Sequence, residues 1–127
     1  MAQEYFDRLS GLMQEVTASM SIRADLEIKH FFSGAAVYAD GRICISLTPA
    51  GLAVKLPEPL RNDLLQEKGT KRLRYFPKAP IKKDYVVLSK AILNNMDVLR
   101  FWLERSIVYV LTLPKPKKKK ATKKIAG

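Results

Sequence analysis

The side chains best suited to nucleophilic or general-base chemistry in this sequence are a single histidine, His30, and a single cysteine, Cys44. A general base must reach the group that it deprotonates, and no nucleophile or orienting acid stands in a recognisable pattern around His30. Cys44 lies in a run typical of a strand, where a lone cysteine is usually a small buried hydrophobic residue. We therefore predict no catalytic residues and expect the protein not to be an enzyme. An uncharacterised enzyme or small-ligand binder is the last of the alternatives.

The residues that could bind a metal ion are too few or too scattered for a recognisable site. The closest carboxylates, Asp25 and Glu27, make only a weak pattern. One histidine and one cysteine exclude a zinc site built from those residue types, and a single cysteine excludes an internal disulfide. We therefore predict no metal ion and no cofactor.

Basic residues are more informative, because they are concentrated in two segments. The chain has 23 Lys and Arg against 12 Asp and Glu, a formal net charge of +11. Residues 114–127 and residues 68–83 each contain seven basic residues and no acid, so the rest of the chain is slightly acidic. The first group is Lys115, Lys117, Lys118, Lys119, Lys120, Lys123 and Lys124, and the second is Lys68, Lys71, Arg72, Arg74, Lys78, Lys82 and Lys83.

Both segments have the chemistry needed to contact a polyanion. Lysines neutralise phosphates and release counterions, so the tail is expected to bind DNA or another polyanion without sequence preference. On a strand, Arg72, Arg74 and Phe76 would share one face suited to phosphate contact and stacking. The alternative is a solvated sheet edge whose charges prevent aggregation. The predicted contact residues are Lys71, Arg72, Arg74, Lys78, Lys82 and Lys83 with the seven tail lysines, and none is expected to read bases.

Two turns predict the central strands of the fold. Asp40-Gly41 between two apolar runs is typical of a two-residue hairpin, and residues 48–51 are typical of a four-residue loop. Both turns place the same side chains of the middle strand on one face, which predicts a three-stranded antiparallel meander with one buried face. The expected pairs are Ala39–Arg42, Tyr38–Ile43, Val37–Cys44, Ala36–Ile45, Leu47–Leu52, Ile45–Val54 and Ile43–Leu56.

Helices and two further strands complete the predicted fold. Apolar residues at helical spacing predict a helix over residues 5–20, and a short helix follows Pro57 and Pro59 with Gly69 near its end. Residues 71–76 and 84–88 are expected to be strands, joined by a loop with two prolines. Ser89 is expected to cap one turn and Asn94 a closing helix, while residues 107–113 fit either a helix or a strand.

The closing helix has a wider apolar surface than one packing face requires. Phe101, Val108 and Tyr109 lie off its main apolar stripe. We predict that these residues contribute to a protein interface, such as that of a homodimer. In this alternative hypothesis the chain is a protein-interaction module with no nucleic-acid role, and the tail only adds solubility.

For the whole chain we predict an α+β fold, in which an antiparallel sheet of about five strands packs against an N-terminal helix and C-terminal helices. Residues 1–113 have the size of one domain, and residues 114–127 contain too little apolar surface to form a core, so we expect a disordered lysine-rich tail. No apolar run approaches the ~18–20 residues of a membrane span, and the first residues do not resemble a signal peptide. We therefore expect a cytoplasmic protein without membrane contact.

Several segments in order carry a family resemblance. Residues 29–34, Lys-His-Phe-Phe-Ser-Gly, lead into residues 37–47, an aromatic-ended strand, the Asp-Gly turn and a second apolar strand. Residues 52–56, a helix, a lysine-rich loop, a strand with Tyr85 and a closing helix with Trp102 follow. This order, over roughly residues 22–109, resembles the TfoX/Sxy N-terminal domain family.

The resemblance implies a small domain of bacterial regulators that promote expression of DNA-uptake competence genes together with a cyclic-AMP receptor protein. The family is not known as an enzyme, so it implies no catalytic residue. Its full-length regulators have a second, helical C-terminal domain where this sequence has the lysine tail, and Phe31 and Ser33 replace a Met and a Gly of the family motif. We therefore expect a regulatory or accessory protein that acts near DNA, through protein contacts of the domain and electrostatic contacts of the tail.

Overall fold

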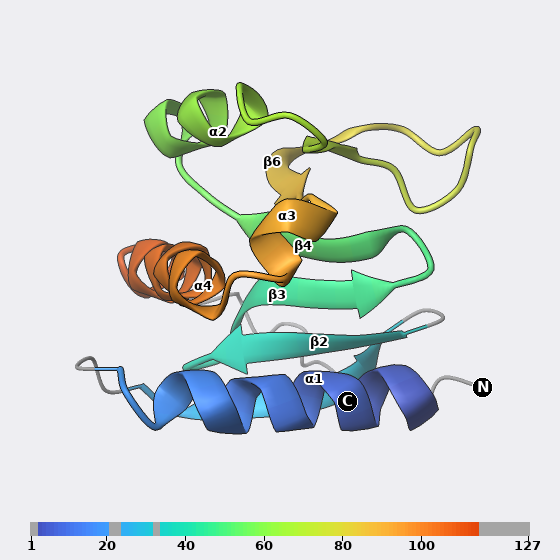
Figure 1. Cartoon of the computed structure of the whole chain (residues 1–127). Helices are drawn as coiled ribbons and strands as arrows, with labels where there is room; N and C mark the ends of the chain where they lie inside the picture. Colours follow the sequence, from blue (N-terminus) through green and yellow to red (C-terminus); the bar gives the residue numbers. More distant parts are fainter. Residues whose placement is uncertain (1–2, 21–23, 32–33, 115–127) are drawn as a thin grey trace.

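The computed structural model describes residues 3–20, 24–31 and 34–114. These residues form a six-stranded antiparallel sheet with the order β1-β2-β3-β4-β6-β5 and four helices (Figure 1). None of the described helices is long and apolar enough to cross a membrane. The predicted α+β class is confirmed. The strands are β1 Leu26–Phe31, β2 Gly34–Ala39, β3 Arg42–Thr48, β4 Gly51–Lys55, β5 Lys71–Leu73 and β6 Lys82–Val87, and the helices are α1 Gln3–Thr17, α2 Glu58–Leu65, α3 Lys90–Leu93 and α4 Met96–Leu111.

The sheet has six strands instead of five because β1 was not predicted. Its sequence, Leu-Glu-Ile-Lys-His-Phe, begins with the apolar and polar alternation of a strand with one covered face. It pairs with β2 along its whole length, from Leu26–Ala39 to Phe31–Gly34. At the opposite edge β5 is shorter than predicted and stops at Leu73, so residues 74–76 belong to a loop.

Both predicted hairpin turns are present. Asp40 and Gly41 have φ angles of 50° and 84°, the left-handed conformation that a two-residue type I′ turn requires. A carboxylate oxygen of Asp40 accepts a hydrogen bond at 2.8 Å from the backbone N–H of Asp25, which ties the turn to the start of β1. The confirmed pairs are Ala39–Arg42, Tyr38–Ile43, Leu47–Leu52 and Ile45–Val54.

A β-bulge changes the predicted register of β2 and β3 beyond the first turn. The register shifts between Val37 and Tyr38, so two residues of β3 lie opposite one residue of β2. A bulge does not change the turn itself, and turn residues therefore cannot predict it. The observed pairs are Val37–Ile45 and Ala36–Ser46 where Val37–Cys44 and Ala36–Ile45 were predicted, and the predicted Ile43–Leu56 pair is wrong because β4 ends at Lys55.

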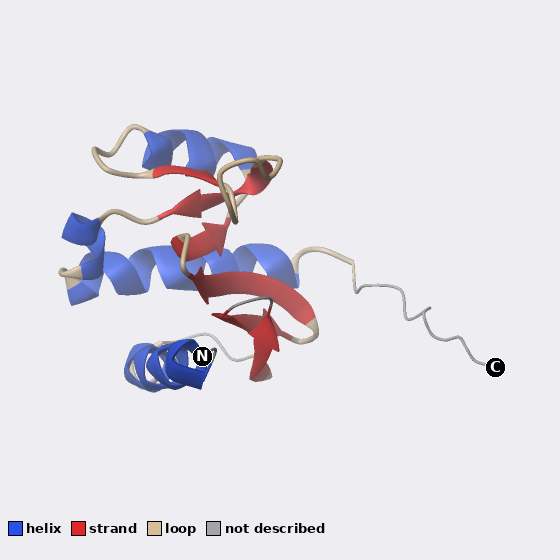
Figure 2. Ribbon diagram, turned by 90° about the vertical axis from the view of Figure 1, so that its right-hand side faces the viewer, coloured by secondary structure: helices blue, strands red, loops and turns tan. Residues whose placement is uncertain are grey.

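The main core lies between one face of the sheet and the helices. In Figure 1 α1 lies in front of β2, and α4, seen nearly end-on, lies to the left of β3 and β4; Figure 2, turned by 90°, shows α4 lengthwise. Burying an aliphatic side chain completely contributes about 1.5–3 kcal/mol, so this layer carries most of the apolar stabilisation. Its fully buried members include Leu9 and Val16 of α1, Leu103, Ile107 and Val110 of α4, and Val37, Ile45 and Val54 of the sheet.

Capping side chains define where the last two helices begin. The hydroxyl of Ser89 accepts a hydrogen bond at 3.2 Å from the backbone N–H three residues later, which confirms the predicted cap of α3. The cap of α4 is Asn95 instead of Asn94, because the Asn95 side chain accepts from the N–H of Val98 at 3.3 Å. α4 continues to Leu111, so residues 107–111 are helical.

The short helix α2 begins where the prolines predict and ends before the predicted glycine. Pro57 is its N-cap and Pro59 lies in its first turn, where a missing N–H costs nothing. The helix ends at Leu65, and Gly69, with a φ angle of 88°, lies in the turn that leads to β5.

Candidate functional site

Five of the predicted contact residues lie together at one edge of the sheet. Lys71 and Arg72 belong to the edge strand β5, Lys82 and Lys83 to its neighbour β6, and Lys78 to the loop between them. All five residues are exposed. Since residues 68–83 contain no acid, the charges of this segment are not paired within it. We call these five residues the basic edge.

Arg74 does not share a face with Arg72 and Phe76, because β5 ends before it. The Nη1 of Arg74 donates a hydrogen bond to the carbonyl of Ala79 at 2.7 Å, which closes the loop of residues 74–81. A bond from a charged donor is stronger than a neutral one, so Arg74 stabilises this loop. Phe76, in the same loop, is 62% exposed.

A hollow of about 390 Å³ brings three cationic side chains together beside the basic edge. Arg61 of α2, Arg72 of β5 and Lys83 of β6 line it, together with Glu58. The guanidinium of Arg61 is held by Asp84, with 3.1 Å between Nη1 and Oδ1. Guanidinium and ammonium groups in this arrangement can hold a phosphate group by charge-assisted hydrogen bonds.

Arg61 is a candidate contact residue that the sequence interpretation missed. It lies outside the basic segment and between the acids Glu58 and Asp63, so its neighbours in the chain give no sign of a basic surface. Only the position of α2 beside β6 brings its side chain to Asp84 and into the same hollow as Lys83. No pattern in the sequence predicts that these two elements lie side by side.

The face of the sheet turned away from the described helices has mainly small residues and tyrosines, and few large aliphatic residues. Ala36, Ser46 and Ala53 are fully buried there. A second apolar cluster lies on this side, and no helix contributes to it. We call this surface the helix-free face. Besides the three small residues it carries Phe31, Tyr38, Tyr75 and Tyr85, the apolar residues Leu73 and Val87, the acid Glu27, and the lysines Lys29, Lys55 and Lys71.

The rings of the helix-free face form one group. The ring of Phe31 lies edge-on to Tyr75 with 5.8 Å between the centroids, and the ammonium of Lys29 lies 4.9 Å from the centroid of Tyr38. Burial raises the pKa of Tyr38, Tyr75 and Tyr85, and for Tyr75 the hydroxyl of Ser46 acts in the opposite direction. The phenols are therefore neutral at physiological pH and partly removed from water.

The two residues considered first for catalysis lie in unrelated environments. His30 stacks on the ring of Phe6 in α1, with 4.8 Å between the centroids. Cys44 is fully buried, and its Sγ donates to the carbonyl of Val37 at 3.4 Å. Burial raises the pKa of the Cys44 thiol to about 12, which leaves it protonated and poorly nucleophilic at neutral pH. Among the described residues no three His, Cys, Asp or Glu side chains are placed to hold a metal ion.

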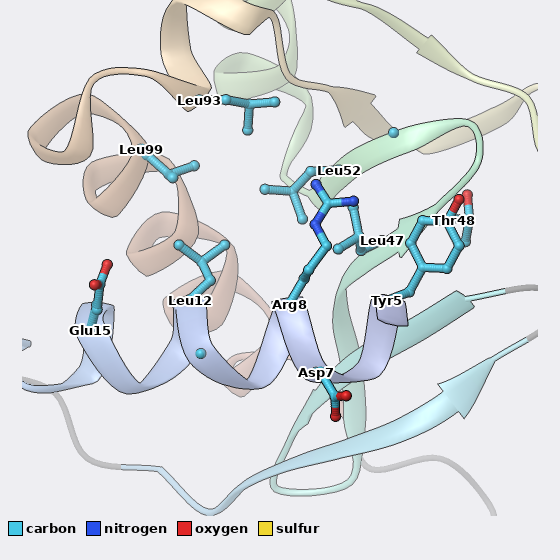
Figure 3. Close-up of a pocket in the computed structure, with 12 residues that line it drawn as sticks. Tyr5, Asp7, Arg8, Leu12, Glu15, Leu47, Thr48, Leu52, Leu93 and Leu99 are labelled. Carbon is cyan, nitrogen blue, oxygen red and sulfur yellow. The ribbon is translucent and has the colours of Figure 1, made fainter. Parts of the chain in front are cut away.

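A groove of about 630 Å³ lies between α1 and the C-terminal helices (Figure 3). The side chain of Arg8 extends from α1 into it, and Tyr5 and Glu15 lie towards its two ends. This combination can receive an apolar group and pair Arg8 with an acid. The apolar lining consists of Leu12, Leu47, Leu52, Leu93 and Leu99, from α1, the β3–β4 hairpin, α3 and α4.

The three residues predicted for a protein interface differ in exposure. Phe101 is 47% exposed, with its ring edge-on to Trp102 at 5.0 Å between centroids. Val108 and Tyr109 are half-buried, and Tyr109 packs against the main core. The other exposed apolar residues on α3 and α4 are Leu93, Met96 and Val98, of which Val98 is one helical turn from Phe101. The other predicted contacts, the lysines from Lys115 to Lys124, lie outside the described residues.

Comparison with known proteins supports the resemblance noted in the sequence. No curated protein and no solved structure matches the chain. The model of the TfoX N-terminal domain matches residues 19–109, a range that contains the whole sheet, α2, α3 and most of α4. The match thus includes both the basic edge and the helix-free face, and it covers well over half of the sequence. The chain therefore belongs to the TfoX N-terminal domain family.

Proposed function

We propose that this competence-regulator-like domain is a non-enzymatic regulatory or accessory protein of the bacterial cytoplasm that acts near DNA. In this proposal the domain contacts a protein partner, such as the transcription factor that the family resemblance implies. The basic edge and the lysines from Lys115 to Lys124 contact phosphates without reading bases. Such contacts raise affinity and the rate of association but carry no sequence information.

The observation that carries this proposal is the hollow lined by Arg61, Arg72 and Lys83. Three elements that are separate in the sequence, α2, β5 and β6, each place one cation there. A solvated edge that only prevents aggregation needs scattered charges, not a shared hollow. Cations that converge in one hollow can neutralise a phosphate together, and Glu58 and Asp84 offset only part of their charge.

The test is binding of the full chain to a random DNA duplex at several salt concentrations. The logarithm of the binding constant should fall with the logarithm of salt concentration, by about 0.9 for each phosphate neutralised. Replacing Arg72 and Lys83 by Gln should reduce this slope by about 2, and replacing the seven tail lysines by Gln should reduce it further. Fluorescence anisotropy of a labelled duplex measures both effects.

Arg8→Gln is the matched control, because Arg8 is exposed on α1, which packs on β1, β2 and β3, away from the edge formed by β6 and β5. It should leave the slope within error of the unmodified chain. Absent or salt-insensitive binding would overturn the proposal. An unchanged slope in the Arg72 and Lys83 variant, with a loss confined to the tail variant, would assign all DNA contact to the tail.

A second candidate function is a protein-interaction module or homodimer without a nucleic-acid role. It is favoured by the exposed apolar side chains Val98 and Phe101 of α4, which are three residues apart and therefore lie on the same side of the helix. Light scattering at high protein concentration tests the homodimer. A dimer that Phe101→Ser converts to a monomer would support it, and a monomeric mass of the unmodified chain would remove it.

A further inference from the structure

The helices of the described chain all pack on one side of the sheet. Each contributes a buried residue to the same core: Leu9 of α1, Leu64 of α2, Ile92 of α3 and Leu103 of α4. The other apolar cluster consists of residues of β4, β5 and β6 with side chains from adjoining loops. An uncovered sheet face normally carries polar residues, so aromatic residues there need a reason.

Small residues beneath the rings explain how the helix-free face is built. Ala36, Ser46 and Ala53 occupy the central strands β2, β3 and β4 and are completely buried although no helix covers them. The side chains that cover them are therefore those of the same face, and Tyr75 interacts with the hydroxyl of Ser46. Tyr38, Tyr75 and Tyr85 each keep part of their surface in water. Aromatic surface is thus presented above a floor of small residues.

Lysines lie beside these rings on both edge strands and on a central strand of the sheet. Lys29, on the edge strand β1, has its ammonium over the ring of Tyr38, so a base that stacks on this side of the ring takes the place of the ammonium. Lys55 of the central strand β4 pairs with Tyr85 of β6. Lys71 lies on the opposite edge strand β5, where it pairs with Val87. The acid among them, Glu27, lies 3.9 Å from the ammonium of Lys29. The net charge of this surface is therefore positive.

We propose that the helix-free face binds single-stranded nucleic acid, with bases stacked on Tyr38, Tyr75 and Tyr85 and phosphates neutralised by Lys29, Lys55 and Lys71. Stacking requires bases whose flat faces are accessible, and a duplex hides those faces between neighbouring base pairs. The face therefore selects single strands, whereas the basic edge contacts any phosphate backbone. This inference rests on the proposed function in taking nucleic acid as the partner, and it adds the form of nucleic acid and the surface.

The ring of Phe76 is a further exposed aromatic group next to Tyr75 in the sequence. It follows Tyr75 in the loop of residues 74–81, and at 62% exposure it is the most exposed of the large apolar side chains of the described residues. Arg74 holds this loop closed through Ala79, which fixes the position from which both rings project. A base at the end of a bound strand can therefore stack on Phe76.

The experiment measures binding of the full chain with its seven tail lysines replaced by Gln, so that the tail does not mask the domain. The probes are labelled 15-nucleotide oligo(dT), oligo(U) and a 15-base-pair duplex, followed by fluorescence anisotropy. We expect the single strands to bind more tightly than the duplex. Tyr38→Leu should weaken single-strand binding at least about fivefold and leave duplex binding unchanged, because one stacked base is worth about 1–3 kcal/mol. Tighter binding of oligo(U) than of oligo(dT) would identify RNA as the favoured strand.

Two further variants keep the test independent of folding. Tyr109→Leu makes the same change on the helix side of the sheet and should have no effect on either probe. Lys29→Gln changes an exposed side chain and should reduce the salt slope for single strands by about 0.7. Thermal unfolding of each variant confirms that the domain remains folded.

The outcomes separate this inference from the proposed function. If the duplex binds as tightly as the single strands, and neither Tyr38→Leu nor Lys29→Gln has an effect, the helix-free face is not a binding surface although the basic edge is. If the chain with replaced tail lysines binds neither single strands nor duplex, while the unmodified chain binds the duplex, the inference is overturned and DNA contact belongs to the tail. If the unmodified chain binds no probe, both the inference and the proposed function fail.

Discussion

The two faces of the sheet bury their side chains in different ways. On the helix side, large aliphatic residues such as Ile45 and Val54 pack against Leu103 and the other buried residues of α1 and α4. On the helix-free face, Ala36 and Ala53 are just as buried, but they are covered by side chains of the sheet and the adjoining loop. Burial on the first side excludes water completely, whereas burial on the second leaves rings and lysines at the surface. One face therefore carries most of the apolar stabilisation, and the other carries the surface that we propose for nucleic-acid binding.

The largest expected effect tests the helix side. Leu103→Ala removes a fully buried side chain between α4 and the sheet, and the cavity should lower the free energy of unfolding by about 2–5 kcal/mol. Denaturant unfolding followed by circular dichroism measures the change. A loss below about 1 kcal/mol would show that the helix layer is not the main source of stability.

Alkaline pH should lower the free energy of unfolding, because the domain buries tyrosine hydroxyls and a cysteine thiol. Burial raises the pKa of Tyr38, Tyr75, Tyr85 and Cys44 above their ordinary values of 10 and 9, so these groups ionise in the unfolded chain before they ionise in the native one. Their contribution is therefore present below about pH 9 and is lost as the pH rises through 9 to 12. Each group that ionises only in the unfolded chain lowers the free energy of unfolding by up to about 1.4 kcal/mol per pH unit.

Urea unfolding at pH 8 and at pH 11 measures this loss. Tyr85→Phe keeps the ring and removes its ionisable hydroxyl, so its stability should fall less between the two pH values than that of the unmodified chain. An equal fall in both proteins would show that Tyr85 is not among the responsible groups.

The floor of the helix-free face gives the next effect in size. Ala53→Leu adds side-chain atoms beneath the rings, and because Ala53 is fully buried it should cost about 1–3 kcal/mol and displace Tyr85. The matched control is Ala91→Leu on the exposed side of α3, which should change stability by less than about 0.5 kcal/mol. Equal stability of the two variants would show that the rings do not lie on the small residues.

The cap of α4 tests how the helix layer is positioned. Asn95→Ala removes the side chain that accepts from the N–H of Val98, so it should cost about 1 kcal/mol. Asn94→Ala should cost less, because α4 is capped by the next residue. Thermal unfolding of the two variants compares them directly, and a larger loss for Asn94→Ala would place the start of α4 one residue earlier.

The smallest expected effect belongs to the surface of the helix-free face. The pair of Glu27 and Lys29 is exposed and separated by 3.9 Å, so Glu27→Gln should change the free energy of unfolding by less than about 0.5 kcal/mol. The same variant removes the negative charge beside Lys29 and should tighten binding of oligo(dT). A large loss of stability would give this pair a structural role instead.

The parts of the fold that could be predicted depend on local chemistry. Asp40 and Gly41 give a two-residue turn because both must adopt positive φ, and Ser89 caps α3 because its hydroxyl reaches an N–H three residues later. The bulge near Tyr38 depends on pairing between strands, which no short window of sequence contains. The alternation in β1, by contrast, is a local signal that the sequence interpretation missed. Asn94 and Asn95 are the same residue type and each can cap a helix, so the sequence alone does not decide that Asn95 caps α4.

The candidate site likewise has features that follow from neighbouring residues and features that depend on the packing of distant elements. By itself the sequence determined the number of charges and their concentration in residues 68–83, since this segment contains no acid. Only the tertiary structure decided which of these charges act together. In the structure Arg74 closes a loop, and Arg61 lines the same hollow as Arg72 and Lys83. Tyr38 lies with its neighbouring rings on the helix-free face. The physical reason is that composition and turn chemistry are properties of neighbouring residues, whereas a surface is made by elements distant in sequence that pack together.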